Sequence, residues 1–252
     1  MLERQEKELV VDLHEGLCFN EFGRAVTSLL EDLLYRTCHL DLPVKHLNLV
    51  QDELTPRNRK DFERLRNILQ SVERLASSGT LAEVVLLQGS TVPLAQTATH
   101  ICMHPALWDD NTPRCDSALR DSIIKIFRAV CAADLPSPKF SKSFLFVRLI
   151  PRPSIRTFSS SDLPSIRTDE CGEVMSANSA GTRLSATAEA FDVEGFERRA
   201  GLPVSRAKCR TVFCLRQDGE RRRINENADT SDKESPGVWL QLIQHLPTVS
   251  CS

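Results

Sequence analysis

The hydrophobic content of this 252-residue chain falls sharply after about residue 150, and this fall limits which part can build a core. Leucine, isoleucine, valine and phenylalanine make up about 33% of residues 1–150 but about 21% of residues 151–252. A segment with the lower content buries too little apolar surface to offset the entropy lost on folding. The composition therefore predicts a folded domain over residues 1–158 and a mostly disordered, low-hydrophobicity tail over residues 159–252.

One apolar pattern near the C-terminus is an exception within this tail. Val238, Leu242 and Leu246 follow one another at four-residue intervals, which is the spacing of a single helical face. The pattern predicts a short terminal helix over residues 237–246.

The charge, the apolar runs and the cysteine content argue against several classes of protein. The chain has 32 basic and 34 acidic residues, and a formal charge of −2 argues against a protein that coats nucleic acid or an anionic membrane. No apolar run reaches the roughly 20 residues that span a bilayer, and the N-terminus has no apolar core typical of a secretory signal. Nine cysteines without such a signal predict reduced thiols in the cytosol or nucleus.

Apolar residues recur with helical spacing in three long stretches of the first 150 residues. Asn20 suits the N-cap of the first helix, Gly79 suits the position after the second, and Thr112 suits the N-cap of the third. Pro43 suits the first turn of a shorter helix. The predicted helices cover residues 22–34, 43–50, 59–78 and 113–134.

Short runs rich in β-branched and aromatic residues lie between these helices and predict buried strands. The helices do not alternate regularly with the strands, so the pattern predicts an α+β fold. The predicted strands cover residues 9–13, 81–87, 99–103 and 144–150.

Sequence motifs of common catalytic sites are missing. The chain has no Gly-rich phosphate loop, no GxSxG elbow, no HExxH pair and no CxxC pair. These absences disfavour an enzyme.

The strongest candidate for a metal site is the group His100, Cys102 and His104. Alternate residues of a strand share one face, which would bring two imidazoles and a thiol together. Because no fourth ligand is evident and strands often carry a polar face, the structural interpretation is favoured and metal binding remains an alternative. Cys209 and Cys214 are interpreted as free thiols.

Four segments stand in a characteristic order along the first part of the chain. They are LLYRTCHLDLPVKHL at the end of the first helix, VVLLQG in the first buried strand, IFRAVCAAD in the third helix, and RPSIRT at residues 152–157. In this order they resemble the comet protein family of the spindle assembly checkpoint, which binds mitotic arrest deficient protein two, written here as Mad-two. The resemblance covers residues 9–157.

The resemblance implies a HORMA-like domain, in which three helices pack on one face of a mainly antiparallel sheet. It also implies a non-enzymatic adaptor without a cofactor, which docks by its third helix on the dimerisation surface of closed Mad-two. Such proteins present closed Mad-two to an AAA+ remodelling ATPase and so promote disassembly of the mitotic checkpoint complex. This implies a location in the nucleus and cytoplasm, with spindle or kinetochore association in mitosis.

The protein-binding residues follow from the same resemblance. Phe127 matches the phenylalanine of the family's third helix, with Arg128 beside it and Ile123 one turn earlier. Arg36 stands where the family usually has a glutamine. Periodicity alone offers another interpretation of Phe127, since Ile126 and Val130 share its stripe and would place it in the core.

The chain departs from the family after the third helix. Most of the segment that separates this helix from RPSIRT is missing, and with it the Pro-Lys loop that contacts the ATPase. Because the sequence after RPSIRT does not resemble the closing strands, the C-terminal half of the sheet is predicted to be incomplete. A truncated isoform without full function, with unpaired strand edges, is therefore a further alternative.

Overall fold

The computed structural model describes residues 5–14, 17–37, 40–103, 116–136, 142–150, 195–202, 207–217 and 237–250. All of these residues belong to one compact unit, which joins residues 1–152 to residues 193–252. Among them, no helix combines the length and the apolar character that a membrane crossing requires.

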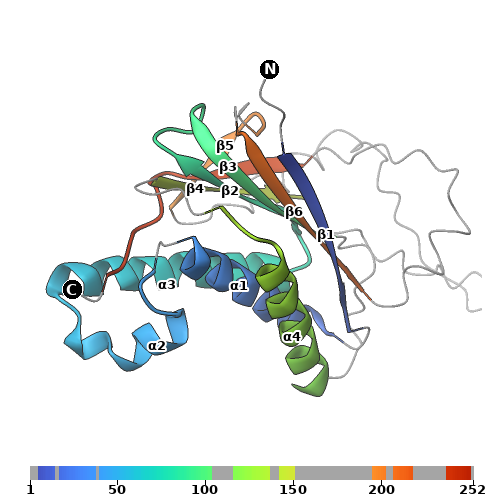
Figure 1. The fold of residues 1–252 in the computed structure, drawn as a ribbon, viewed down its shortest axis with the longest axis horizontal. Coiled ribbons are helices and arrows are strands. Elements are labelled where there is room, and N and C mark those ends of the chain that lie inside the picture. The colour runs from blue at the N-terminus through green and yellow to red at the C-terminus, as the bar shows by residue number, and fades with distance from the viewer. Residues whose placement is uncertain are drawn as a thin grey trace, which may run out of the picture. The chain divides into compact units, whose positions relative to one another are not determined.

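The helices of the described part lie on one side of a single sheet (Figure 1). They confirm the predicted long helices, although the beginning of the third one, including Thr112, lies outside the described residues. Their bounds are α1 (Phe19–Arg36), α2 (Val44–Leu49), α3 (Pro56–Ser77) and α4 (Asp116–Ala132), with a 3₁₀ turn, η1 (Gln51–Glu53), between α2 and α3.

Seven strands form this sheet, in the order β1-β6-β3-β2-β4-β7-β5. Strand β6 pairs in parallel with β1 and β3, whereas the other four pairings are antiparallel. The predicted α+β class is confirmed, and the sheet is mixed. The strands are β1 (Gln5–Leu13), β2 (Leu81–Gly89), β3 (Ala95–Met103), β4 (Lys142–Leu149), β5 (Phe196–Arg199), β6 (Cys209–Gln217) and β7 (Val238–Leu242).

The prediction of a mostly disordered tail is wrong for the described residues after residue 158. Three of the seven strands come from this region, and the domain boundary predicted at residue 158 therefore divides one sheet. Residues 238–242 form a strand rather than the predicted terminal helix, because they pair with β4 on one side and β5 on the other. Within the described residues, this half of the chain contributes β5, β6 and β7 to the sheet.

Local sequence explains where the helices begin and end. The Thr55 hydroxyl accepts a hydrogen bond from the Asn58 backbone amide, and Pro56 occupies the first turn, so α3 begins three residues earlier than predicted. Gly79 follows its end with φ +70°, as predicted. Asn20 lies inside α1 instead of capping it, because the helix begins after Cys18.

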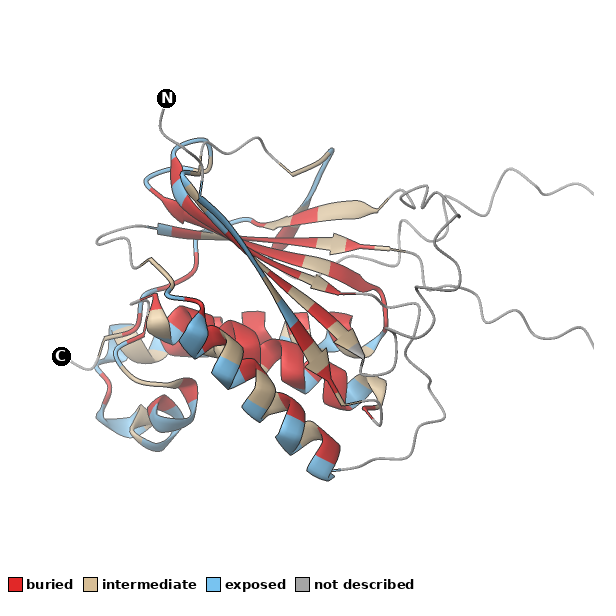
Figure 2. Ribbon diagram, turned by 45° about the vertical axis from the view of Figure 1, so that its right-hand side comes forward, coloured by how far each residue is buried: buried red, intermediate tan, exposed pale blue. Residues whose placement is uncertain are grey.

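The sheet has two different faces. Phe213 on β6 lies beside Ile101 on β3, and both are fully buried on the face that the helices cover. The opposite face, called the outer face below, carries a second buried apolar cluster. Figure 2 shows buried residues concentrated in the strands, α1 and α3, whereas α2 and α4 carry more exposed residues. The members of the second cluster are Val85, Leu87, Ala98 and Phe146, with Ala95.

Candidate protein-binding surface on helix α4

Three large apolar side chains gather near the crossing of α1 and α4 and remain accessible to solvent. Phe127 is 51% exposed, Ile124 is 40% exposed and Tyr35 is 38% exposed. Phe127 and Ile124 lie on successive turns of α4, and Tyr35 and Phe127 line the same groove. We call these three residues the α4 patch. An exposed aromatic side chain on a rigid helix is typical of residues that dominate binding energy in protein interfaces.

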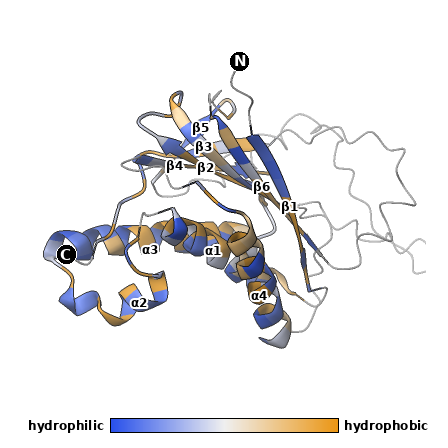
Figure 3. Ribbon diagram, in the orientation of Figure 1, coloured by the Kyte–Doolittle hydropathy of each residue, from blue (hydrophilic) through white to orange (hydrophobic). Residues whose placement is uncertain are grey.

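Helix α4 buries a different side of its surface. Ala118, Ile126 and Val130 are buried, whereas Phe127, the neighbour of Ile126, faces largely into solvent. Figure 3 shows hydrophobic and hydrophilic residues mixed along α4, as expected of a helix with one covered side. The periodicity that could have placed Phe127 in the core therefore describes Ile126 and Val130 but not Phe127.

Strand β1 and the residue that follows it hold α4 at two points. The Lys7 ammonium donates to the carbonyl oxygens of Ala132 and Ala133, each at 2.9 Å. A cation at this end of a helix satisfies carbonyl groups that have no intrahelical partner. In the second turn of α4, the Ser122 hydroxyl accepts a hydrogen bond from the backbone amide of His14, the residue after β1, at 3.0 Å. These contacts hold the α4 patch on a fixed support.

Arg36 connects α1 to the α4 patch. Its guanidinium carbon lies 5.3 Å from the centre of the Phe127 ring, within the range of a cation–π interaction. One terminal nitrogen donates to the Cys131 sulfur at 3.0 Å, and Nε lies 3.6 Å from an Asp32 carboxylate oxygen. Asp32 therefore balances the charge of Arg36, while the guanidinium group of Arg36 packs against the Phe127 ring.

The other two predicted binding residues lie close to this arrangement. Ile123 is half-buried and lines the groove beside Phe127, and Arg128 is exposed on α4. Sequence reasoning missed Ile124 and Tyr35. Ile124 lies outside the helical stripe used for the prediction, and Tyr35 becomes a neighbour of Phe127 only through the crossing of two helices.

A groove of about 160 Å³ lies beside the α4 patch, between α1, α2 and α4. Burial raises the pKa of the Glu31 carboxyl in this groove, and Lys45 partly opposes the shift. Burial also raises the pKa of Asp32, against the opposing effect of Arg36. The groove is thus acidic and partly desolvated. Its lining residues are Ser28, Glu31, Asp32, Tyr35, Pro43, Val44, Lys45, Ile123, Ile126 and Phe127.

We expect Glu31→Gln to stabilise the fold at neutral pH. Because the pKa of Glu31 is higher in the folded chain than in the unfolded chain, the folded state holds this proton more tightly. Stability therefore falls as the pH rises from the unfolded value, about 4.3, through the folded one. Glutamine removes this loss, and we expect a gain of about 0.5 kcal/mol at pH 7 that disappears near pH 4.

Urea denaturation at the two pH values measures this difference. Glu63→Gln, at an exposed position of α3, is the matched control and should leave the free energy of unfolding unchanged. A loss of stability in Glu31→Gln at pH 7 would show that attraction to Lys45 outweighs the burial of the carboxylate.

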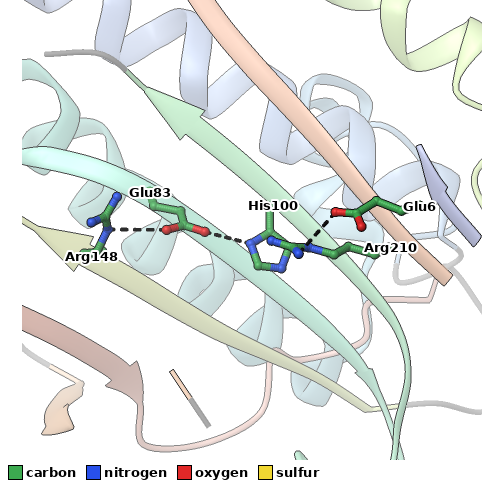
Figure 4. Close-up of polar contacts among 5 residues, drawn as sticks. All are labelled: Glu6, Glu83, His100, Arg148 and Arg210. Carbon is green, nitrogen blue, oxygen red and sulfur yellow. Dashed lines mark hydrogen bonds and ion pairs between the residues drawn. The ribbon is translucent and has the colours of Figure 1, made fainter. Parts of the chain in front are cut away.

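The group considered as an alternative metal site, His100, Cys102 and His104, is only partly within the described residues. His100 is buried on the outer face of the sheet, and its Nδ1 lies 2.7 Å from Glu83 Oε1 (Figure 4). Glu83 Oε2 lies 3.3 Å from Arg148 Nε, so the same carboxylate contacts two partners. His104 lies outside the described residues, and within these no group of three or more histidine, cysteine or acidic side chains is placed to hold a metal ion.

Cys102 faces Cys214 across the pairing of β3 with β6, and both are free thiols. Burial raises the pKa of Cys102 to about 12. Burial, followed by the hydrogen bond to Glu8, raises the pKa of Cys214 to about 11. Burial thus favours the protonated form of both thiols, and neither forms a disulfide with a described residue. Cys209 is also a free thiol, on the same strand.

No protein-family model matches the chain, and no curated protein matches its sequence.

Proposed function

We propose that this protein is a non-enzymatic adaptor of the spindle assembly checkpoint, similar to the comet protein, and that it binds closed Mad-two through the α4 patch. The observation that carries the proposal is the exposure of Phe127, which is 51% exposed on a helix anchored by strand β1. A core phenylalanine at this position would have contradicted it. The ordered resemblance of residues 9–157 supplies the identity of the partner.

The α+β architecture is compatible with the HORMA-like fold that this proposal includes. Three long helices lie on one side of a mixed sheet whose pairings are mostly antiparallel. In this proposal, α4 packs against the corresponding helix of closed Mad-two and occupies its dimerisation surface. Arg36 and Ile123 support the Phe127 ring, and Arg128 lies beside it.

The further partners follow from the same proposal. By occupying closed Mad-two, the protein would present it to an AAA+ remodelling ATPase and promote disassembly of the mitotic checkpoint complex. The ATPase would supply all of the ATP chemistry, and the adaptor would need no cofactor of its own. The protein would act in the nucleus and cytoplasm, and at spindles or kinetochores in mitosis.

We expect Phe127→Ala to weaken binding of closed Mad-two by at least about 30-fold. This corresponds to about 2 kcal/mol, the usual threshold for a residue that dominates an interface. Calorimetric titration of the full chain with closed Mad-two measures the effect. Because Phe127 is already half exposed, its removal should leave the thermal unfolding temperature nearly unchanged.

Leu94→Ala provides the matched control. Leu94 is 59% exposed in the turn between β2 and β3, so the substitution also removes an exposed apolar side chain but outside the α4 patch. We expect it to bind closed Mad-two as the unaltered chain does. Equal affinity of Phe127→Ala and the unaltered chain, or no binding by the folded unaltered chain, would refute the proposal.

A further inference from the structure

A second and larger groove lies on another part of the molecule, between α3 and the end of β7. Its volume is about 470 Å³. None of its lining residues lines the groove beside the α4 patch, so the two surfaces can be altered independently. It is lined by Arg64, Asn67, Ile68, Gln70, Ser71 and Arg74 from α3, and by Gly195, Leu242, Ile243 and Gln244 from the strand side.

One wall of this groove is a polar stripe with an arginine at each end. Arg64, Asn67, Ser71 and Arg74 follow one another at three- and four-residue intervals, which places them along one face of α3. Ten residues of α-helix separate Arg64 from Arg74, a rise of about 15 Å. The two cations therefore mark the ends of an elongated site.

The two arginines have no partner among the described residues. Neither guanidinium takes part in an ion pair or hydrogen bond there, although both line the groove. The neighbouring Glu73 carboxylate is directed to Arg24, 3.8 Å away. Beside the groove, burial and then the positive charges of Lys142 and Arg64 lower the pKa of His245, while Asp61 opposes this effect. At the Arg64 end of the groove, the negative charge of Asp61 therefore balances only part of the positive charge of Arg64 and Lys142.

The opposite wall carries the aliphatic side chains of Leu242 and Ile243 together with the polar Gln244. Ile243 is 60% exposed, while its neighbour Leu242 and Ile68 on α3 are buried. Gly195 also lines the wall, and a Cβ atom built there would meet only Leu242, at 3.9 Å. Ile243 can therefore make aliphatic contacts with a bound molecule, and Gly195 has no side chain that would fill the groove.

We propose that this groove binds an extended acidic segment of a partner protein. Carboxylates of the segment pair with Arg64 and Arg74, and an apolar side chain between them covers Ile243. A fully extended chain rises about 3.3 Å per residue, so about five residues span the two arginines. Guanidinium groups suit such a ligand because they bind carboxylates through two parallel hydrogen bonds.

A protein segment fits this groove better than a single-stranded nucleic acid. Nucleic-acid sites of this kind use aromatic side chains on which bases stack, and the described lining contains only aliphatic and polar side chains. The chain also has a formal charge of −2, which opposes general attraction of a polyanion. The local pair of arginines instead matches a short segment that carries a few carboxylates.

A fluorescein-labelled peptide of about eight residues, with glutamates on both sides of a leucine-valine centre, tests the proposal by fluorescence anisotropy with the full chain. We expect saturable binding that added salt weakens, because screening acts on exposed ion pairs. Arg64→Glu and Arg74→Glu should each weaken binding about tenfold or more, and a peptide with lysine in place of glutamate should not bind.

Arg66→Glu is the matched control, because Arg66 is exposed on α3 but does not line the groove. It should retain most of the affinity. Arg64→Ala and Arg74→Ala, checked by circular dichroism, separate loss of the contact from misfolding.

The proposal is overturned if no acidic peptide binds, if all three arginine sites contribute equally, or if an oligonucleotide binds in its place with dependence on Arg64 and Arg74. Because closed Mad-two is not used, failure here leaves the adaptor proposal unaffected.

Discussion

Replacing Phe213 with alanine is expected to lower the free energy of unfolding by about 3–5 kcal/mol. The Phe213 side chain is fully buried on β6, and its strand lies between β1 and β3. Its register neighbours are Leu9 and Ile101, so the lost ring leaves a cavity where three strands meet. Urea denaturation followed by circular dichroism measures the change. The effect is large because the ring is fully buried and its removal leaves a cavity in the core.

Val212→Ala is the control for this experiment. Val212 is the next residue of the same strand but is half-buried on the outer face, so its truncation should cost only about 1 kcal/mol. Near-equal stability of Phe213→Ala and the unaltered chain would show that β6 does not belong to the core. A chain that ends at residue 158 provides a second check. Without β6, strand β1 loses its only neighbour in the described sheet, and cooperative unfolding should disappear.

The helices and strands of the first 150 residues could be predicted because each of them has its own pattern of apolar residues. The α3 stripe and the apolar run in β2 can be identified within one window of sequence. Strand β6 has an alternating pattern as well, with Thr211, Phe213 and Leu215 on the covered face. That pattern was lost in the average composition of a long polar region. Its partners, β1 and β3, are more than 100 residues away in sequence, where no local pattern can indicate them.

The candidate sites show the same limit. Phe127 and Arg36 could be proposed from a resemblance, but their 5.3 Å contact depends on how α1 crosses α4. Arg64 and Arg74 lie on one face of α3, a helix that the sequence predicts. From the sequence alone they are indistinguishable from ordinary solvent-exposed charges. Only the position of Ile243 beside α3 turns this helical face into the wall of a groove. Sequence thus indicates which side chains share an element, whereas a site between elements requires the fold.

Removing the Glu83 carboxylate is expected to destabilise the protein by about 3 kcal/mol in Glu83→Ala. This carboxylate is largely buried on the outer face, where it contacts the buried His100 ring and Arg148 (Figure 4). Alanine leaves the buried His100 nitrogen without its hydrogen-bond partner and the Arg148 guanidinium without its ion-pair partner, which costs more than the interactions themselves contribute. Arg148 keeps one favourable contact, because its guanidinium carbon remains 6.0 Å from the Trp239 ring. Glu83→Gln retains one acceptor oxygen and should lose about half as much.

The same face provides an exposed ion pair for comparison. Glu6 and Arg210 lie 3.2 Å apart, but both side chains are about half exposed, so Glu6→Ala should change the free energy of unfolding by less than about 0.5 kcal/mol. Chemical denaturation of both variants at one pH and salt concentration measures the contrast. Equal effects at Glu83 and Glu6 would contradict the argument, because burial of the acceptor and its two partners is the feature that distinguishes these carboxylates. A large loss confined to Glu83 would show that the carboxylate in contact with His100, the residue considered as an alternative metal ligand, stabilises the sheet.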